Sequence, residues 1–305
     1  MSRTNGTDSI GCAIVTYNGA KHLPRCLPPL LNSRLTPKVI IIDSSSTDDT
    51  VKVAKEFGVQ VVVILQKNFN HGSTRELARS SLRTDIVVML TQDAYFADSS
   101  MLEKLVQPIV EKKASVAYAR QIPHLGAGFF ESFPREFNYP SSSEIRSIQD
   151  LDRYGTYTFF CSNSCAAYCN FSLGEIGGFP HVLLGEDTVA AAKLLRNGGK
   201  IAYVAESVVH HSHRYSLWQE FQRNFDTGFA RNGYAKYLKG GSGDSRRGWL
   251  FARTMLITLA KQKPLLLPYG CVQIFAKWLG FFLGRNSLHA PKWFKKMMSS
   301  QRYYW

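Results

Sequence analysis

Four acidic side chains stand where the sequence could use them for chemistry. Asp43 and Asp93 each follow an apolar, strand-like run, and Glu186 and Asp187 open a predicted helix. A carboxylate at the end of a strand can accept hydrogen bonds from a nucleotide, or bind a hard divalent cation that also contacts a diphosphate. An ionised aspartate at a helix start can act as a general base toward a hydroxyl. The competing interpretation of Asp93, Glu186 and Asp187 is a helix cap.

Basic residues suggest partners for these acids. His210, His211 and His213 follow a later strand-like run, and on an extended chain His211 and His213 point to the same face. One of these imidazoles, with Asp93 and two phosphate oxygens, would form a plausible shell for Mg²⁺ or Mn²⁺. Arg75 is a candidate for a phosphate contact. An ordinary core or surface position is the alternative for the histidines and the arginine.

The common nucleotide-binding fingerprints are absent from the sequence. There is no G-x-G-x-x-G after the first strand-like run and no G-x-x-x-x-G-K-[ST]. The segment IIIDSSSTDDT, residues 40–50, offers another solution in which Asp43 contacts the nucleotide and the polar residues after it cap a helix. Three cysteines spaced by four are expected to be small buried side chains rather than a metal cluster: Cys161, Cys165 and Cys169.

Short apolar runs alternate with helix-like segments over the first 120 residues, which predicts βαβ units and a mainly parallel sheet. In such sheets ligands bind beyond the carboxyl ends of the strands, where polar residues follow each run. We expect residues 119–158 to be a loop-like flap or insertion, and two strands at 201–204 and 208–209. The predicted strands are 10–15, 39–42, 59–65, 86–90, 114–118 and a run within 159–168, and the predicted helices are 23–32, 48–57, 74–81, 101–111 and those after 217.

The basic charge is concentrated at the end of the chain. The formal net charge is +14, and residues 246–305 contain eleven Lys or Arg residues and no Asp or Glu. Such a surplus indicates an anionic partner. The segment IFAKWLGFFLGR, residues 274–285, fits a helix lying in a membrane interface better than one crossing it. The alternative is a helix packed on the core with a basic outer face. The absence of an apolar leader at the start predicts a cytoplasmic location.

The ordered motifs resemble the family 2 glycosyltransferases, which are inverting sugar-nucleotide enzymes of the GT-A fold. AIVTYN, IIIDSSSTDDT, NFNHGSTRELA, GGF followed by GEDT, and VVHHSHRYS occur in the family's order between residues 10 and 215. The resemblance implies an α/β fold with a Rossmann-like, mixed but mainly parallel sheet flanked by helices. It divides the chain into a GT-A domain, residues 1–215, and a helical, basic, membrane-associating extension, residues 216–305.

A narrower resemblance is to bacterial rhamnosyltransferases that use dTDP-L-rhamnose. In that subfamily the metal motif reads S/T-Q-D-A, and here it is Thr91-Gln92-Asp93-Ala94. NFNHG, HSHRYS and the aromatic C-terminus ending in Trp305 are also similar. One of the two aspartates of the general D-x-D motif is therefore missing.

The resemblance implies a role for each candidate residue. Asp187 would be the catalytic base, with Glu186 and Asn163 in orientation or acceptor contact. The cation, Mg²⁺ or Mn²⁺, would bind Asp93 with His211 or His213. The nucleotide would contact Thr16, Tyr17, Asn18, Asp43, Ser45, Arg75, Gln92 and Asp93.

The implied reaction moves L-rhamnose from dTDP-β-L-rhamnose to a saccharide acceptor, with inversion, in bacterial cell-surface polysaccharide synthesis. The acceptor would be carried on a polyprenyl diphosphate, and the enzyme would be peripheral on the inner face of the cytoplasmic membrane, bound to anionic lipid. One alternative keeps the fold and uses a UDP-hexose donor. Another is a non-catalytic, basic nucleic-acid-binding protein, which the position of the charges disfavours. The oligomeric state stays open.

Overall fold

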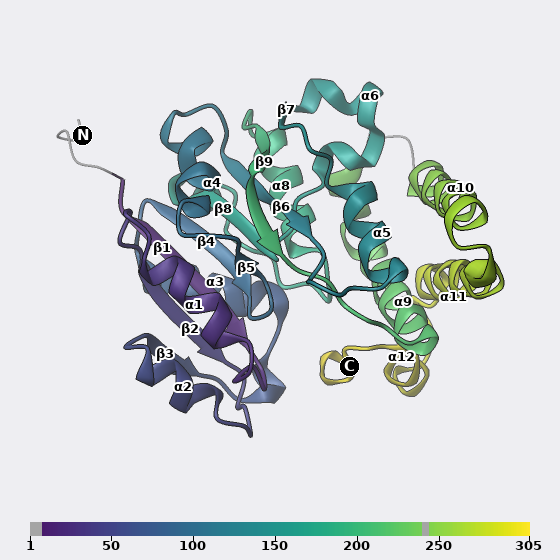
Figure 1. Cartoon of the computed structure of the whole chain (residues 1–305), viewed down its shortest axis with the longest axis horizontal. Coiled ribbons are helices and arrows are strands. Elements are labelled where there is room, and N and C mark those ends of the chain that lie inside the picture. Colours follow the sequence, from purple (N-terminus) through teal and green to yellow (C-terminus); the bar gives the residue numbers. More distant parts are fainter. Residues whose placement is uncertain (1–7, 240–243) are drawn as a thin grey trace.

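A nine-stranded mixed sheet forms the centre of the computed structural model, which describes residues 8–239 and 244–305 (Figure 1). The strand order is β3-β2-β1-β4-β8-β6-β9-β5, and β7 pairs with β9. Strands β1 to β4 are mutually parallel, as are β6 and β9, whereas β8, β5 and β7 run antiparallel to their neighbours. The strands are β1 Ile10–Thr16, β2 Lys38–Asp43, β3 Gln60–Val63, β4 Ile86–Thr91, β5 Tyr95–Phe96, β6 Val116–Ile122, β7 Glu144–Arg146, β8 Cys165–Cys169 and β9 Ile201–His210.

Helices cover both faces of this sheet because successive strand residues point to opposite faces, and both faces are apolar. Ile40, Val87 and Met89 lie in the core cluster that includes α3 and α8 residues. Ile41 and Val88 lie in the cluster on the other face, with residues of α1 and α4. The helices are α1 Leu23–Leu31, α2 Thr50–Glu56, α3 His71–Leu82, α4 Met101–Val110, α5 Phe129–Asn138, α6 Leu151–Tyr154, α7 Asn170–Glu175, α8 Glu186–Arg196, α9 Leu217–Tyr234, α10 Asp244–Gln262, α11 Leu267–Asn286 and α12 Lys292–Met298.

The expectation of a loop-like flap at residues 119–158 is wrong. Strand β6 continues to Ile122, and α5, β7 and α6 follow. Helix α5 forms because Phe129, Phe133 and Phe137 recur every four residues, on one side of the helix, and pack against residues of α10 and α11. Within β7, the Arg146 side chain is fully buried and donates to the Tyr118 hydroxyl at 2.7 Å and to the Phe160 carbonyl at 2.8 Å. Long-range contacts therefore order a segment whose own pattern is weak.

Two smaller predictions also need correction. The expected strands at 201–204 and 208–209 are one strand, β9, whose pairing with β6 shifts register after Ala119. Within the run 159–168, the strand β8 begins only at Cys165. Cys165 and Cys169, which are four apart on β8, lie on one face and pack in one core cluster, whereas Cys161 precedes the strand and lies in the other cluster, so these three thiols do not converge on a metal. Cys161 and Cys165 are buried, as expected.

The predicted helical C-terminal extension is present, and its helices lie at the side of the sheet far from β3 (Figure 1). Three glycines bring α9 and α11 into backbone contact. A Cβ atom at Gly228 would overlap the Phe281 carbonyl of α11, and one at Gly280 or Gly284 would overlap a carbonyl of α9. Residues 264–286 are long and apolar enough to cross a membrane by length and composition. Their close packing along α9 nevertheless attaches α11 to the folded protein.

The end of the chain returns from α12 to α9 and to the loop before α8. Ser300 donates through its amide and its hydroxyl to Asp226 of α9, at 2.9 and 2.5 Å. The Trp305 ring packs edge-on against Phe229 of α9, with centroids 4.7 Å apart, and Tyr304 stacks on His181 at 6.1 Å. The C-terminal aromatic residues therefore contact the loop that precedes Glu186 and Asp187.

Candidate active site

The loops after β1 and β2 are joined through Asp43. Its carboxylate is fully buried, and it accepts hydrogen bonds from the Thr16 hydroxyl at 2.9 Å and from the Ser46 amide and hydroxyl at 2.9 and 2.5 Å. The Asn18 amide donates to the Ser46 hydroxyl, and the Asn18 side chain accepts from the next amide along the β2 loop. Ser45 has a positive φ and donates to a carbonyl after β3. Asp43 therefore shapes the predicted nucleotide pocket from within.

Gln92 joins the loop after β4 to the loop after β1. Its side-chain amide makes a reciprocal pair with the main chain of Tyr17, accepting from the amide at 2.9 Å and donating to the carbonyl at 3.1 Å. A Cβ atom at Gly19 would overlap the Gln92 side chain, so this close approach requires glycine. Gln92 thus positions the Tyr17 ring, which is 43% exposed at the carboxyl edge of the sheet.

Asp93, His211 and His213 converge as predicted. Asp93 Oδ1 lies 3.6 Å from His211 Nε2, Asp93 Oδ2 lies 3.4 Å from His213 Nδ1, and the three candidate ligand atoms lie within 4.8 Å of one another. Burial lowers the pKa of His213 to about 4 and holds that of His211 well below its ordinary value. Neutral imidazoles and one carboxylate suit a divalent cation. These residues are called the metal triad below. His210, the third histidine of the sequence cluster, instead stacks on Tyr95.

Gln121 of β6 orients the metal triad, and the sequence analysis missed it. His211 Nδ1 lies 2.8 Å from Gln121 Oε1, an acceptor, so Nδ1 carries the proton and Nε2 presents a lone pair toward Asp93. The Gln121 amide in turn donates to the Ser162 hydroxyl at 2.9 Å. A single glutamine near the end of a strand forms no motif, so no sequence signal pointed to it.

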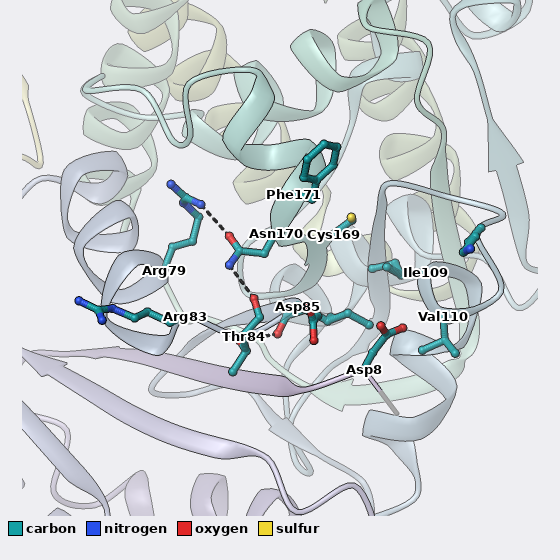
Figure 2. A pocket seen from close by; sticks show the side chains of 12 residues that line it. Asp8, Arg79, Arg83, Thr84, Asp85, Ile109, Val110, Cys169, Asn170 and Phe171 are labelled. Carbon is teal, nitrogen blue, oxygen red and sulfur yellow. Dashed lines mark hydrogen bonds between the residues drawn. The ribbon is translucent and has the colours of Figure 1, made fainter. Parts of the chain in front are cut away.

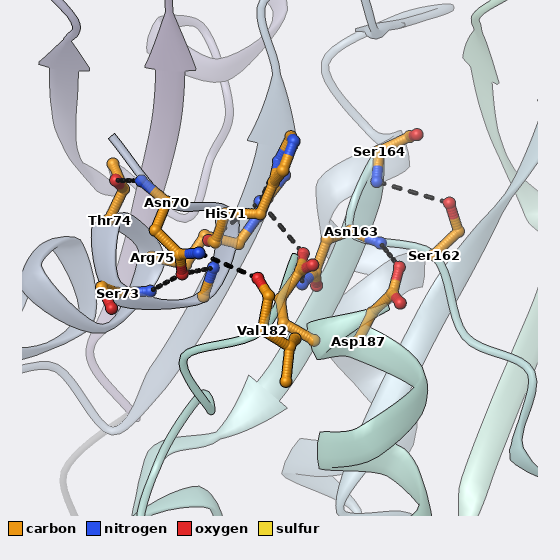
Figure 3. A network of polar contacts seen from close by, with 12 residues as sticks. Asn70, His71, Ser73, Thr74, Arg75, Ser162, Asn163, Ser164, Val182 and Asp187 are labelled. Atoms are coloured by element: carbon orange, nitrogen blue, oxygen red, sulfur yellow. Dashed lines mark hydrogen bonds and ion pairs between the residues drawn. The ribbon is translucent and has the colours of Figure 1, made fainter. Parts of the chain in front are cut away.

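Glu186 and Asp187 open α8 as predicted, and their environments differ. Arg75 Nη1 lies 3.0 Å from Glu186 Oε1, with both side chains at most 5% exposed, and the Asn163 amide also donates to Glu186. Asp187 accepts from the main-chain amides of Asn163 and Thr188, at 3.1 and 2.7 Å. Figure 3 shows Asp187 and Asn163 across from the first turn of α3, which supplies His71 and Arg75.

The two carboxylates have opposite pKa shifts. Burial, followed by the nearby charge of Glu186, raises the pKa of Asp187 to about 6. Burial would also raise the pKa of Glu186, but the Arg75 guanidinium and its neighbours outweigh it and lower that pKa. Glu186 is therefore ionised and paired with Arg75, whereas Asp187 is the carboxylate that can exchange a proton near neutral pH. Arg75 itself is buried against α8, where it contacts a carboxylate.

Asp187 and the metal triad belong to one site because adjacent residues contact them. Ser162 accepts from Gln121, which orients His211, and the next residue, Asn163, donates its amide to Asp187. The segment before β8 thus lies between the two groups. All of these side chains come from the carboxyl ends of the parallel strands or from loops beside them, as the topology requires.

A cavity of about 400 Å³ lies at the opposite end of the sheet (Figure 2). It is lined by the residues before β4 and after β8 and by the ends of α3 and α4, including Arg79, Arg83, Asp85, Lys112 and Asn170. None of the predicted site residues lines this cavity. The candidate active site and this cavity therefore lie at different ends of the strands.

Known proteins resemble the chain both in sequence and in structure. The family model described as glycosyl transferase family 2 matches residues 12–177. The O-antigen chain rhamnosyltransferase RfbN of Salmonella typhimurium is 38% identical, over 96% of this chain and 94% of that protein. WbaN of Salmonella anatum, with the same description, is 40% identical over 88% of this chain and 86% of that protein.

Solved structures support the fold. A mannosyltransferase of Pyrobaculum calidifontis, in complex with GDP-Man and Mn²⁺, has a TM-score of 0.60 at 16% identity, covering 98% of this chain and 85% of that one. TarS of S. aureus, residues 1–349 in complex with UDP-GlcNAc, has a TM-score of 0.56 at 13% identity, covering 92% and 91% of the two chains. The likeness confirms the GT-A architecture expected from the sequence.

Proposed function

The chain belongs to glycosyl transferase family 2, and from this premise we propose that it transfers L-rhamnose from dTDP-β-L-rhamnose to a saccharide hydroxyl. The product would be an α-L-rhamnoside of a bacterial cell-surface polysaccharide. The assignment of rhamnose as the donor sugar rests on the sequence identity to two O-antigen chain rhamnosyltransferases, which extends over most of the chain. The alternative of a non-catalytic nucleic-acid-binding protein loses its support, because the family is enzymatic.

Asp187 is the proposed general base. Its carboxylate takes the proton of the acceptor hydroxyl while that oxygen attacks the anomeric carbon from the face opposite the diphosphate. The carbon–oxygen bond to the acceptor forms, the bond to the phosphate breaks with its electron pair, and dTDP leaves. Arg75 forms an ion pair with the ionised Glu186, which offsets part of the negative charge beside the base. A base with a pKa near 6 is ionised at neutral pH and still basic enough to accept a proton.

The metal triad is the proposed site of Mg²⁺ or Mn²⁺. One carboxylate oxygen and imidazole nitrogens within 4.8 Å of one another fit such an ion, and the Gln121 contact presents the correct nitrogen of His211. The ion would supply positive charge that stabilises the departing diphosphate. The residues proposed to bind the nucleotide are those of the cross-linked loops, namely Thr16, Tyr17, Asn18, Asp43, Ser45 and Gln92.

Helix α11 is the proposed membrane contact of a peripheral enzyme on the inner face of the cytoplasmic membrane. One face of α11 carries exposed apolar side chains at near-helical spacing, and Trp278 stacks on Phe282 with ring centroids 5.5 Å apart. The eleven Lys and Arg residues of 246–305, with no acid among them, suit anionic phospholipid. Such a position would bring the site to an acceptor carried on a polyprenyl diphosphate. The exposed side chains are Tyr269, Val272, Phe275, Trp278 and Phe282.

The donor is tested by melting temperature and by product release. A nucleotide that binds only the native state raises the melting temperature, so dTDP, UDP and GDP are compared with and without Mn²⁺. We expect the largest increase with dTDP and Mn²⁺, and release of dTDP from dTDP-L-rhamnose when a saccharide acceptor is added. A response to UDP alone would favour the alternative of a UDP-hexose donor.

The membrane contact is tested by flotation with liposomes. The full chain is expected to float with vesicles containing phosphatidylglycerol and much less with phosphatidylcholine alone. Trp278→Ser combined with Phe282→Ser should reduce flotation, whereas Phe171→Ser, which removes an exposed aromatic ring from α7, should not. Equal flotation of the double variant and the parent chain would contradict the assignment of α11.

A further inference from the structure

One arginine of the C-terminal helices lies beside the metal triad. The Arg223 guanidinium, from the second turn of α9, lies 4.6 Å from the centroid of the Tyr215 ring. That ring stacks on His213, with centroids 5.0 Å apart, and His213 lies 3.4 Å from Asp93. A single aromatic ring therefore separates the guanidinium of Arg223 from a candidate metal ligand.

Arg223 has no counter-ion among residues 8–239 and 244–305, the part of the chain that the structure describes. Among the described residues, no carboxylate lies within ion-pair distance of it, and its side chain is exposed. Arg75 differs, because it is buried and paired with Glu186. Burial is the main cause of the low pKa values of His71 and His213, but the positive charge of Arg223 contributes to both. Its charge thus reaches the metal triad and the start of α3.

Helix α9 holds Arg223 in a defined place. Ser216 caps the helix by accepting from the Gln219 amide, and the Gln219 side chain accepts from the Ser216 amide, which completes a capping box. The glycine contacts with α11 hold α9 from Phe221 to Gly228, the part of the helix that includes Arg223. The Tyr215 ring lies 4.6 Å from the guanidinium carbon and gives it an aromatic contact beside His213. A planar, pre-oriented guanidinium suits bidentate binding of a phosphate.

We propose that Arg223 binds a phosphate group in the active site, so that the C-terminal helical region completes a site otherwise built by residues before 216. This inference rests on the proposed function, because a diphosphate is the anion expected next to the metal triad. Two diphosphates share that chemistry, namely the one of the nucleotide donor and the one of a polyprenyl-linked acceptor.

The test measures the binding of two diphosphates to the full chain in the presence of Mn²⁺. Calorimetry compares dTDP with thymidine, and farnesyl diphosphate with farnesol. Arg223→Gln should weaken the binding of one diphosphate by about 10- to 100-fold, as expected for loss of a hydrogen bond to a charged group. Binding of thymidine and farnesol should not change. The affinity of Arg223→Lys should lie between those of the parent chain and Arg223→Gln, because lysine keeps the charge and lacks the planar guanidinium.

Matched variants separate this role from a general loss of charge or structure. Arg83→Gln removes an exposed positive charge at the opposite end of the sheet and should leave both affinities unchanged. Tyr215→Leu removes the aromatic ring that contacts Arg223 and should weaken the binding of the same diphosphate to a smaller extent. Tyr215→Phe keeps the ring and should bind it with nearly the affinity of the parent chain. The melting temperature of each variant is measured to show that it is folded.

The outcomes identify the source of the phosphate or overturn the proposal. If Arg223→Gln loses affinity only for dTDP, Arg223 binds the diphosphate of the donor. If it loses affinity only for farnesyl diphosphate, Arg223 binds the diphosphate of the acceptor. If Arg223→Gln binds both within twofold of the parent, or if the parent binds neither, the proposal fails. A parent chain that binds dTDP through Arg223 but transfers no rhamnose would instead overturn the proposed function and leave the arginine assignment intact.

Discussion

The two ends of the central sheet contain similar residues in different surroundings. Helix α3 extends from one end to the other and contributes an arginine to each. At the carboxyl end, Arg75 pairs with Glu186, and their side chains are 4% and 5% exposed (Figure 3). At the opposite end, one turn later, Arg79 pairs with Glu76, and these side chains are 19% and 30% exposed (Figure 2 shows Arg79). The opposite end has the cavity, but the carboxyl end has the buried charges.

The comparison indicates that buried charges, more than the presence of a cavity, identify the candidate active site. Charges that remain in water interact weakly, and exposed pairs contribute little. Charges removed from water shift one another's pKa values. Asp187 is an example, because burial and the charge of Glu186 raise its pKa to about 6. Four experiments test this comparison.

The largest effect is expected for Asp187→Asn. An amide cannot accept the proton of the acceptor hydroxyl, and general-base catalysis contributes about 10²- to 10⁴-fold, so kcat should fall by about 10³-fold. Affinity for dTDP should be unchanged. The matched change Asp85→Asn, at the opposite end, should keep activity within about twofold because Asp85, which accepts from the Ser9 amide and hydroxyl, lies far from the candidate active site. Normal turnover of Asp187→Asn would rule out its role as base.

Arg75→Met should be the most destabilising change. It leaves Glu186 buried without its positive partner, which costs about 3–5 kcal/mol in the free energy of unfolding. Arg79→Met breaks the more exposed pair and should cost about 0–1 kcal/mol for that pair. Urea unfolding followed by circular dichroism measures both. Equal losses for the two arginines would show that burial does not separate the two ends.

Gln121→Leu should weaken metal binding without removing a ligand. Loss of the contact that orients His211 is expected to lower Mn²⁺ affinity by about 10- to 100-fold, measured by electron paramagnetic resonance of free Mn²⁺. Gln107→Leu is the control, because that exposed side chain of α4 contacts only Glu111. An unchanged Mn²⁺ affinity in Gln121→Leu would mean that His211 needs no orienting partner.

The pH dependence should be the mildest effect. Because Asp187 must be ionised, kcat/KM should be constant above about pH 7 and fall about tenfold per pH unit below about pH 6, following the raised pKa. Removing the neighbouring negative charge with Glu186→Gln should move this midpoint to lower pH, since the charge of Glu186 raises the pKa of Asp187. Initial rates of dTDP release between pH 5 and 8 measure the midpoint. A profile without a fall near pH 6 would contradict the assignment.

The strands, the site edge and most candidate residues were predictable because each depends on local spacing. Apolar runs of strand length located β1, β2, β3 and β4, and the residues after them predicted Asp43 and Asp93 at the same edge. The alternation of strand residues predicted that His211 and His213 share a face. The segment 119–158 was not predictable, since α5 and β7 are ordered by contacts with α10, α11 and β9.

The sequence by itself therefore determined the fold family, the order of its motifs, the acids at the carboxyl ends of the strands and the basic, apolar character of the last helices. Only the tertiary structure decided which polar groups pair: Arg75 with Glu186, Gln121 with His211, and Arg223 with none of the acids that the structure describes. The physical reason is that pairing and burial depend on residues far apart in the chain, such as the 90 positions that separate Gln121 from His211. A motif records only spacing along the chain, whereas desolvation, which sets the pKa of Asp187, is created when distant segments pack together.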